Sequence, residues 1–113
     1  MDCCPQHCLV ATYNDEIVGT IIGRETPKEN FKKGYIAMLV VLKQYRKCGI
    51  GRNLAVQLIN EMKKTCKVVS LDAEYDNVPA LHLYESLGFV RTKRLFRYYL
   101  NGNQAYRLKI WFP

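Results

Sequence analysis

An almost wholly apolar run at residues 35–42 is followed by a basic loop at residues 44–51 and an amphipathic segment at residues 51–64. The apolar run predicts a strand that is covered on both faces, as at the centre of a sheet. In the amphipathic segment, apolar side chains recur at the spacing of one helix face: Leu54, Ala55, Leu58, Ile59 and Met62. This order predicts a central strand, a short connection and a helix.

The N-terminal third predicts further sheet. Residues 8–13 and 17–24 are rich in β-forming side chains, and the polar break between them predicts a hairpin. Residues 25–33 carry a proline and several lysines, which predicts an exposed loop. We therefore expect two antiparallel strands before the apolar run.

The segment after the amphipathic helix predicts a second strand and a second helix. Residues 68–74 alternate between apolar and polar side chains, as a strand with two different faces does. Residues 78–87 follow Asn77, which is a good N-cap, and precede Gly88, which is a common stop signal for a helix. Because this unit joins two strands through a helix, we expect the two strands to be parallel.

Residues 90–100 and 105–112 flank an Asn-Gly pair, which is the strongest short signal for a closing hairpin. The order hairpin, strand, helix, strand, helix, hairpin predicts the α/β (α+β) class, with a mixed, mostly antiparallel sheet flanked by helices. A chain of 113 residues without a repeat or a linker predicts a single domain over residues 1–113.

Charge and composition narrow the class of protein. The chain has 17 Lys and Arg against 10 Asp and Glu, a formal net charge of +7, which favours an anionic partner. It has neither a membrane-length apolar run nor a secretion signal, so we expect a soluble, cytoplasmic protein without a membrane partner. Its 5 cysteines form no C-x-x-C pair, which predicts neither structural zinc nor a disulfide framework.

The loop at residues 44–51 carries Gly49 and Gly51 directly before the predicted helix, preceded by Arg46 and Lys47. Glycines let a ligand approach the backbone closely, and a helix N-terminus offers N–H groups without partners together with partial positive charge. The pattern suits a pyrophosphate, although it is neither a nucleoside-triphosphatase loop nor a dinucleotide fingerprint. A tight strand-to-helix connection explains the same glycines.

Two motifs in the same order resemble the signatures of the GCN5-related N-acetyltransferases. R-K-C-G-I-G at residues 46–51 is similar to the acyl-CoA signature R-x-x-G-x-G, and L-Y-E-S-L-G-F at residues 83–89 resembles the second signature. More narrowly, residues 34–39, 83–90 and 93–101 are similar to the catalytic subunits of NatC amino-terminal acetyltransferases. The resemblance covers nearly the whole chain and implies their acyl-CoA N-acyltransferase fold, lacking the first strand and first two helices.

The resemblance also implies acetyl-CoA as the acetyl donor, without a metal. Its pantetheine arm would meet backbone groups of the central strand, and its pyrophosphate would lie on the glycine loop. The residues implied to bind it are Leu39, Val41, Arg46, Lys47, Cys48, Gly49, Ile50, Gly51 and Asn77. For Asn77, an ordinary helix N-cap is an equally good interpretation, and both roles are compatible.

The implied reaction moves an acetyl group to a protein α-amine, whose pKa of about 7.7 to 8.0 requires only a mild base acting through water. Tyr84 matches the family tyrosine that protonates the departing thiolate, and its place on an apolar helix face also fits core packing. Where NatC subunits have L-E-T-E, residues 71–74 read L-D-A-E, so Asp72 is one methylene shorter than the family base. Glu74 shares its face by alternation and is its substitute; both carboxylates also fit ordinary strand-end residues.

Tyr98 and Tyr99 match hairpin tyrosines that hold the substrate backbone in this family. The resemblance further implies acceptors that begin with Met and a bulky apolar residue, and NatC-type auxiliary subunits and the ribosome as partners.

Two alternative functions stay open. Asp72 and the missing N-terminal elements fit a weak or inactive paralogue that binds acyl-CoA or auxiliary subunits. The basic, aromatic residues 91–97 fit a nucleic-acid binder, but strand alternation explains them too, so we expect no specific nucleic acid.

Overall fold

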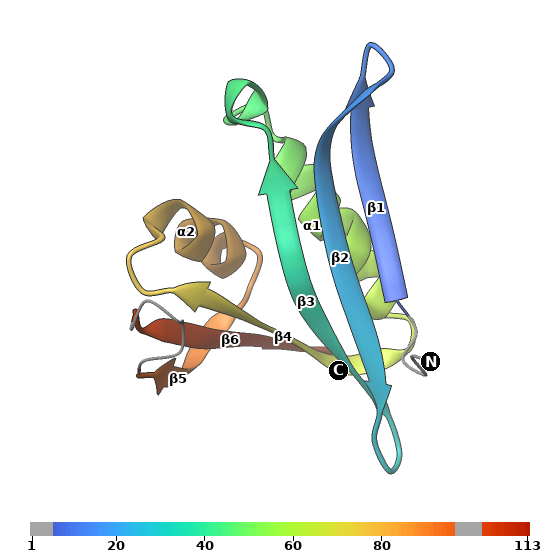
Figure 1. The fold of residues 1–113 in the computed structure, drawn as a ribbon. Coiled ribbons are helices and arrows are strands. Elements are labelled where there is room, and N and C mark those ends of the chain that lie inside the picture. Colours follow the sequence, from blue (N-terminus) through green and yellow to red (C-terminus); the bar gives the residue numbers. More distant parts are fainter. Residues whose placement is uncertain (1–5, 97–102) are drawn as a thin grey trace.

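The computed structural model of the chain describes residues 6–96 and 103–113, which form a six-stranded sheet with two helices (Figure 1). The strands are β1 (Gln6–Tyr13), β2 (Glu16–Pro27), β3 (Lys32–Val41), β4 (Cys66–Glu74), β5 (Val90–Leu95) and β6 (Ala105–Trp111). The helices are α1 (Ile50–Met62) and α2 (Val78–Ser86), and a short 3₁₀ turn, η1 (Lys43–Tyr45), precedes α1.

The strand order is β1-β2-β3-β4-β6-β5, so β3 lies inside the sheet as predicted. Only β3 and β4 are parallel among the strands described, and the remaining neighbours are antiparallel. The expected mixed, mostly antiparallel sheet with flanking helices is therefore confirmed. Within the described ranges, no helix is long and apolar enough to cross a membrane.

The first hairpin forms where the sequence predicts it. Asn14 and Asp15 both have positive φ, 52° and 65°, as the two central residues of a type I′ hairpin turn do. The closing hairpin is also present as β5 paired with β6. Its Asn-Gly turn lies outside the described residues.

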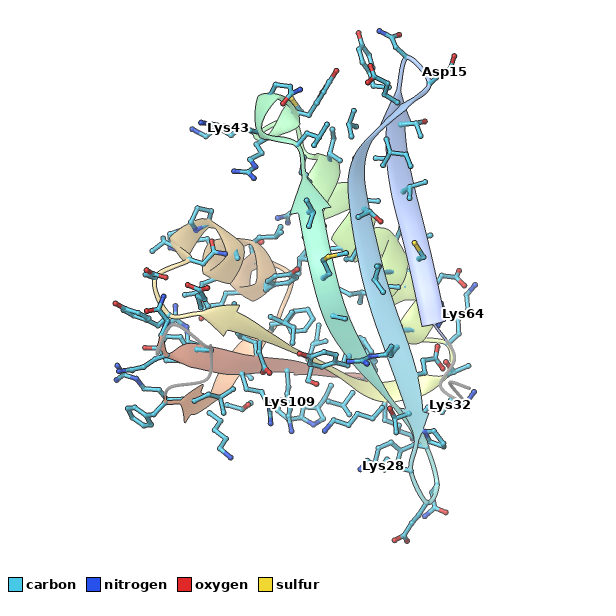
Figure 2. The ribbon with its side chains drawn as sticks, in the orientation of Figure 1. Asp15, Lys28, Lys32, Lys43, Lys64 and Lys109 are labelled. Atoms are coloured by element: carbon cyan, nitrogen blue, oxygen red, sulfur yellow. The ribbon has the colours of Figure 1, made fainter. Side chains whose placement is uncertain are left out.

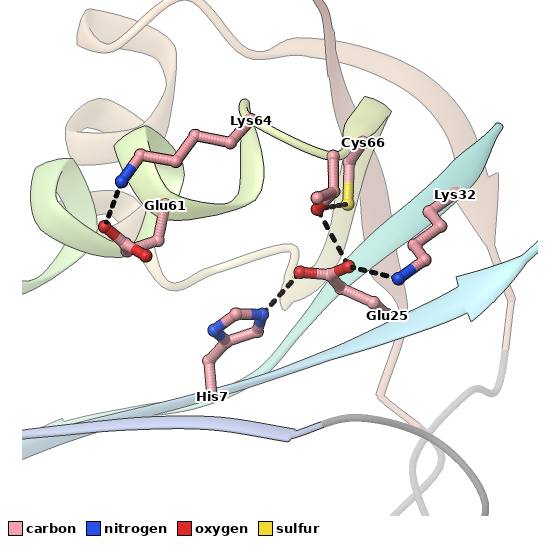
Figure 3. Close-up of polar contacts among 7 residues, drawn as sticks. His7, Glu25, Lys32, Glu61, Lys64 and Cys66 are labelled. Carbon is pink, nitrogen blue, oxygen red and sulfur yellow. Dashed lines mark hydrogen bonds and ion pairs between the residues drawn. The ribbon is translucent and has the colours of Figure 1, made fainter.

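The prediction of an exposed loop at residues 25–33 is wrong at both ends of the segment, although residues 26–31 are exposed. β2 continues to Pro27 and β3 begins at Lys32, which leaves only a short turn between them. Glu25, on β2, is only 4% exposed. Its carboxylate accepts hydrogen bonds from His7 and from the Thr65 hydroxyl (2.9 Å) and lies 3.8 Å from Lys32 Nζ (Figure 3). These partners satisfy the buried charge, so a polar residue continues the strand.

The core lies between α1 and one face of the sheet. The apolar residues predicted for the inner face of α1 are all buried, and they are Leu54, Ala55, Leu58, Ile59 and Met62. The helix approaches the sheet closely at Gly23 of β2, where a Cβ atom would lie 2.5 Å from Met62 Cε and 3.0 Å from Leu58 Cδ2. A larger residue at that position would require the Met62 and Leu58 side chains to shift.

The second half of β3 is covered on one face only, so the predicted burial of both faces is wrong there. Leu39 and Val41 lie under the first turn of α1, where both are within 4 Å of a Cβ built on Gly51. Met38 and Val40 are 41% and 45% exposed on the opposite side. We call this side, which α1 does not cover, the open face of the sheet.

β3 and β4 stop pairing midway along their length. They pair from Lys32 to Tyr35 on β3 and from Cys66 to Ser70 on β4, and no pairing continues beyond those residues. β3 stays with β2 up to Val41, whereas β4 stays with β6 up to Glu74. Figure 1 shows the two strands diverging, with α1 behind β2 and β3 and α2 beside the free half of β4. This divergence creates the candidate site.

Candidate active site

A cleft of about 930 Å³ opens where β3 and β4 diverge. Its walls are residues 36–41 of β3, 45–47 and 49–52 of the loop and α1, and 71–74 of β4, together with Asn77, Pro79, Ala80, Leu83 and Tyr84 around α2. The lining includes side chains from both faces of the sheet, such as Leu39 beneath α1 and Met38 on the open face. The cleft can therefore admit one reactant from each face.

The N-terminus of α1 forms one end of the cleft. Its N-cap residue, Gly49, has φ 81° and provides no side-chain hydrogen bond to the first turn. A Cβ atom built on Gly49 would meet nothing within 4 Å, so the space beside this backbone is open. The first N–H groups of α1 therefore face a free volume with the positive end of the helix dipole behind them, an arrangement that suits an anion.

The basic residues of the loop and of the first turn of α1 have different roles in the structure. Arg46 Nε donates to the carbonyl of Val41 (3.0 Å), which fixes the loop to the end of β3. Arg52 Nη1 donates to Ser86 Oγ (2.8 Å), so this side chain connects α1 to α2. Lys47 has a φ of 65° and forms no ion pair with the described residues. Lys47 is thus the loop cation that is free to meet an anion.

Most residues expected to bind the donor line this cleft: Leu39, Val41, Arg46, Lys47, Gly49, Ile50, Gly51 and Asn77. Cys48 does not line it; its side chain is exposed, and its thiol donates weakly to the carbonyl of Arg46 (3.6 Å). The N-cap interpretation of Asn77 is confirmed, because its side-chain oxygen accepts from Ala80 N (3.3 Å).

Tyr84 packs in the core and also reaches the cleft. It is 5% exposed, and its ring contacts Phe89 edge to face with centroids 5.5 Å apart. Within the described ranges, the Tyr84 hydroxyl has no hydrogen-bond partner. Every side-chain oxygen that is fully buried in these ranges does have a partner, so the Tyr84 hydroxyl is not fully buried. It therefore retains access to the cleft that Tyr84 lines. Burial raises the pKa of Tyr84 to about 12. The phenol is therefore neutral at physiological pH and can donate a proton or a hydrogen bond.

Asp72 and Glu74 line the cleft on the β4 side, and they have different partners. Both carboxylate oxygens of Asp72 are bound by Arg107, from Nε (2.9 Å) and Nη2 (3.2 Å). The Asp72 side chain is only 3% exposed. Glu74 is half-buried at the end of β4 and accepts from Asn103 Nδ2 (3.2 Å) through one oxygen. Glu74 is consequently the less restrained proton acceptor.

Tyr98 and Tyr99 lie outside the described residues, so their expected contact with the substrate stays a prediction.

Sequence reasoning missed other residues that line the cleft, among them Met38, Tyr45 and Leu83. The apolar run at residues 35–42 is the available signal for Met38, but its continuous hydrophobicity predicts a buried side chain there, and only backbone contacts with the donor are expected from this strand. No group of three metal-ligating side chains occurs within residues 6–96 and 103–113.

The sequence profile of the Acetyltransferase (GNAT) family matches residues 2–89. N-alpha-acetyltransferase 30 of Homo sapiens is 51% identical over 109 residues, which cover 95% of this chain and 30% of the human protein. N-alpha-acetyltransferase MAK3 of Arabidopsis thaliana is 47% identical over 110 residues, which cover 96% of this chain and 58% of the plant protein.

A solved structure shares the arrangement of the strands and helices. A chain in the crystal structure of the NatC complex bound to Gag peptide and CoA superimposes with a TM-score of 0.85 at 37% identity, covering 91% of this chain and 66% of that chain. The present chain thus spans about a third of the human relative and somewhat more than half of the plant one.

Proposed function

Because this chain belongs to the acetyltransferase (GNAT) family, we propose that it transfers an acetyl group from acetyl-CoA to the free α-amine of a protein N-terminus. The observation that carries this proposal is the cleft between β3 and β4, which has an uncapped helix N-terminus at one end and opens to both sheet faces. The names of the human and plant relatives and the CoA in the NatC structure support it.

The chain's own residues fit the donor. The first N–H groups of α1 are suited to its diphosphate, since Gly49 leaves them uncovered and Lys47 adds a full positive charge. Backbone groups of β3 beyond Tyr35 have no partner on β4, so those around Leu39 and Val41 can hydrogen-bond to its amide-containing arm. Acetyl-CoA supplies an activated thioester, and the protein supplies binding and orientation.

The acceptor amine enters from the open face, because α1 and the loop take up the other side. A C–N bond forms as the C–S bond breaks, and the amine loses a proton while the departing sulfur gains one. Glu74 takes the amine proton through a water molecule, since Arg107 binds both oxygens of Asp72. The neutral Tyr84 phenol donates to the departing sulfur from the α2 side.

The proposed acceptors begin with Met followed by a bulky apolar residue. Met38 and Val40 support this preference, because both are exposed on the open face and line the cleft. Apolar side chains of the acceptor would bury against them and gain hydrophobic stabilisation. Tyr98 and Tyr99 are proposed to hold the acceptor backbone.

We also propose NatC-type auxiliary subunits, the ribosome and the cytoplasm as the setting of this activity. The similarity to one chain in the structure of the NatC complex supports the first of these. The net charge of +7 favours an anionic partner such as the ribosome. New protein N-termini emerge from the ribosome, so the substrate would be available there.

A second candidate function is binding of acyl-CoA or auxiliary subunits without efficient turnover. The ion pair between Arg107 and Asp72 favours it, because a carboxylate bound through both oxygens is a poor proton acceptor. Asp72 occupies the position of the family base, so a weak enzyme is the natural consequence if Glu74 does not replace it.

Titration calorimetry with acetyl-CoA, combined with single-turnover acetylation of a Met-Leu peptide, tests both candidates. The enzyme proposal expects micromolar binding and an acetylated peptide, with no product from a peptide whose amine is already blocked. Binding without product would support the second candidate. Absence of binding by a folded chain would remove both.

A further inference from the structure

Cations line the open face of the sheet next to the cleft. Arg107 of β6 lies opposite Asp72 of β4, and Lys109 lies two residues further from the cleft on the same strand face. Lys33 of β3 lies on the other side of β4 and shares this face, because it alternates with residues that point toward α1. In Figure 2, Lys109 appears with Lys28 along the lower side of the sheet.

The charges in this region are close enough to affect one another. Burial, followed by the positive charges of Lys109, Lys28 and Arg107, lowers the pKa of Lys33. Four side chains from β3, β6 and the β2–β3 turn therefore concentrate positive charge in one place. We call Lys28, Lys33 and Lys109 the lysine strip.

The lysine strip has no internal counter-charge. Within the described residues, none of the three lysines forms an ion pair, whereas Arg107 is paired with Asp72. The negative charge of Asp72 acts on Lys33 less strongly than the positive charges of Lys109, Lys28 and Arg107. Three neighbouring lysines repel one another, so an anion placed among them is stabilised by their charges.

We propose that the lysine strip binds acidic side chains of the acceptor, so that the chain favours N-termini followed by Asp or Glu at about positions 3 to 5. This inference rests on the proposed function and names a substrate class for it. The strip begins beside the cleft and is on the face from which the acceptor enters. An acidic acceptor would therefore pass over it on the way to the site.

The distances along β4 determine which acceptor residues can reach the strip. Lys109 and Lys33 lie opposite Ser70 and Val68, which are two and four residues from Asp72. At about 3.3 Å per residue, this places them about 7 and 13 Å along the strand from Asp72. An extended peptide with its first residue at the cleft crosses that span over its next two to four residues.

RNA is the competing ligand for a basic surface, and the strip is small for it. The affinity of a protein for nucleic acid comes largely from the phosphates that it neutralises, and a strong dependence on salt is typical of a protein that contacts about 6 to 10 of them. Three lysines next to a cleft fit two or three carboxylates better than a polynucleotide.

The test compares three peptides that begin Met-Leu and continue with three Glu, three Ser or three Lys residues. We expect kcat/KM for the Glu peptide to exceed that for the Ser peptide about tenfold at low salt, and the ratio to fall toward one near 0.5 M salt. In the double variant Lys33→Gln/Lys109→Gln the ratio should fall below about twofold. The matched control Lys63→Gln/Lys64→Gln removes two charges after α1, away from the strip, and should keep the preference.

Equal kcat/KM for the three peptides, or a preference that survives in the Lys33→Gln/Lys109→Gln variant, would overturn the inference. Binding of an RNA oligomer that this variant loses, with equal peptide rates, would assign the strip to RNA instead. Fluorescence anisotropy of the same labelled peptides tests the strip even without turnover. Loss of turnover with all peptides, alongside a preserved difference in binding, would count against the proposed function and in favour of the strip.

Discussion

Arg107 and Asp72, which are 35 residues apart in the chain, face each other across β6 and β4 and join through two hydrogen bonds of 2.9 and 3.2 Å. This pair occupies the position where the resemblance implies the catalytic base. The Arg107–Asp72 pair therefore affects both the stability of the sheet and the proton acceptors of the cleft. Urea unfolding measures the first effect, and the rate of acetyl transfer measures the second.

Replacement of Arg107 by Met should destabilise the fold. The change leaves the Asp72 carboxylate, which is 3% exposed, without its main partner, at a cost of about 2 kcal/mol. Urea unfolding at pH 7 measures the difference. Arg91→Met is the matched control, because Arg91 also donates two hydrogen bonds, to Glu85, but both side chains are well exposed. The control should cost less than about 1 kcal/mol, and equal losses in the two variants would contradict the prediction.

Replacement of Tyr84 by Phe should slow acetyl transfer without unfolding the chain. The change removes only a hydroxyl that has no hydrogen-bond partner in the described part of the chain, so the free energy of unfolding should shift by less than about 0.5 kcal/mol. Loss of the proton donor should reduce the single-turnover rate about 100-fold, with acetyl-CoA affinity unchanged.

The pKa of about 12 for Tyr84 adds a pH criterion. Because the phenol stays protonated well above pH 10, no fall in rate from its ionisation is expected up to that pH. Tyr106→Phe is the control, since Tyr106 is half-buried on β6 outside the cleft. A Tyr84→Phe variant as fast as Tyr106→Phe would eliminate the assigned role.

Glu25 should make the stability of the chain depend on pH. Its burial opposes ionisation, but hydrogen bonds from His7 and Thr65 and the charges of His7 and Lys32 outweigh that effect and lower the pKa of Glu25 below 4.5. A lowered pKa in the folded state means that the stabilisation is present above pH 4.5 and is lost as the pH falls through the folded-state value.

The variant Glu25→Gln should therefore be less stable than the wild type at pH 7, by about 1 to 2 kcal/mol, and the gap should close near pH 3. Urea unfolding at pH 7, 5 and 3 follows the difference. Glu61→Gln is the control, because Glu61 forms an exposed pair with Lys64 (2.9 Å; Figure 3). Its effect should stay below about 0.5 kcal/mol. A gap for Glu25→Gln that is constant with pH would refute the ionic explanation.

The two glycines of the loop should respond in opposite ways to replacement by Ala. Gly49 has φ 81°, where a Cβ costs about 1 kcal/mol, so Gly49→Ala should destabilise the fold. Gly51 lies inside α1, where a Cβ makes ordinary contacts of 3.6 and 3.8 Å, so Gly51→Ala should stabilise it by up to about 1 kcal/mol. Thermal unfolding measures both changes: the melting temperature should fall for Gly49→Ala and rise for Gly51→Ala. Melting temperatures that move in the same direction would disagree with this geometry.

The local parts of the fold could be predicted from the sequence. The buried face of α1 follows from the helical spacing of Leu54, Leu58 and Met62, and the start of α2 follows from the capping chemistry of Asn77. The place of Gly49 at the N-cap of α1 follows from its position directly before the helical spacing, and its role in binding the donor stays a prediction. Each of these features depends on residues within about two helical turns of one another.

The remaining features depend on contacts between distant segments. Glu25 looked like a loop residue because its partners His7 and Thr65 are 18 and 40 residues away. The pairing of Asp72 with Arg107 depends on the register between β4 and β6, which no local pattern sets. Met38 is exposed because it lies on the open face, which α1 does not cover, whereas a continuous apolar run predicts burial on both sides.

Only four residue pairs, from Lys32 to Tyr35 on β3, join the two halves of the sheet. A ligand bound in the cleft, where β3 and β4 no longer pair, contacts both halves of the sheet and holds them together in place of strand-to-strand hydrogen bonds. Because such a ligand binds the folded chain and not the unfolded one, the melting temperature should rise with ligand concentration.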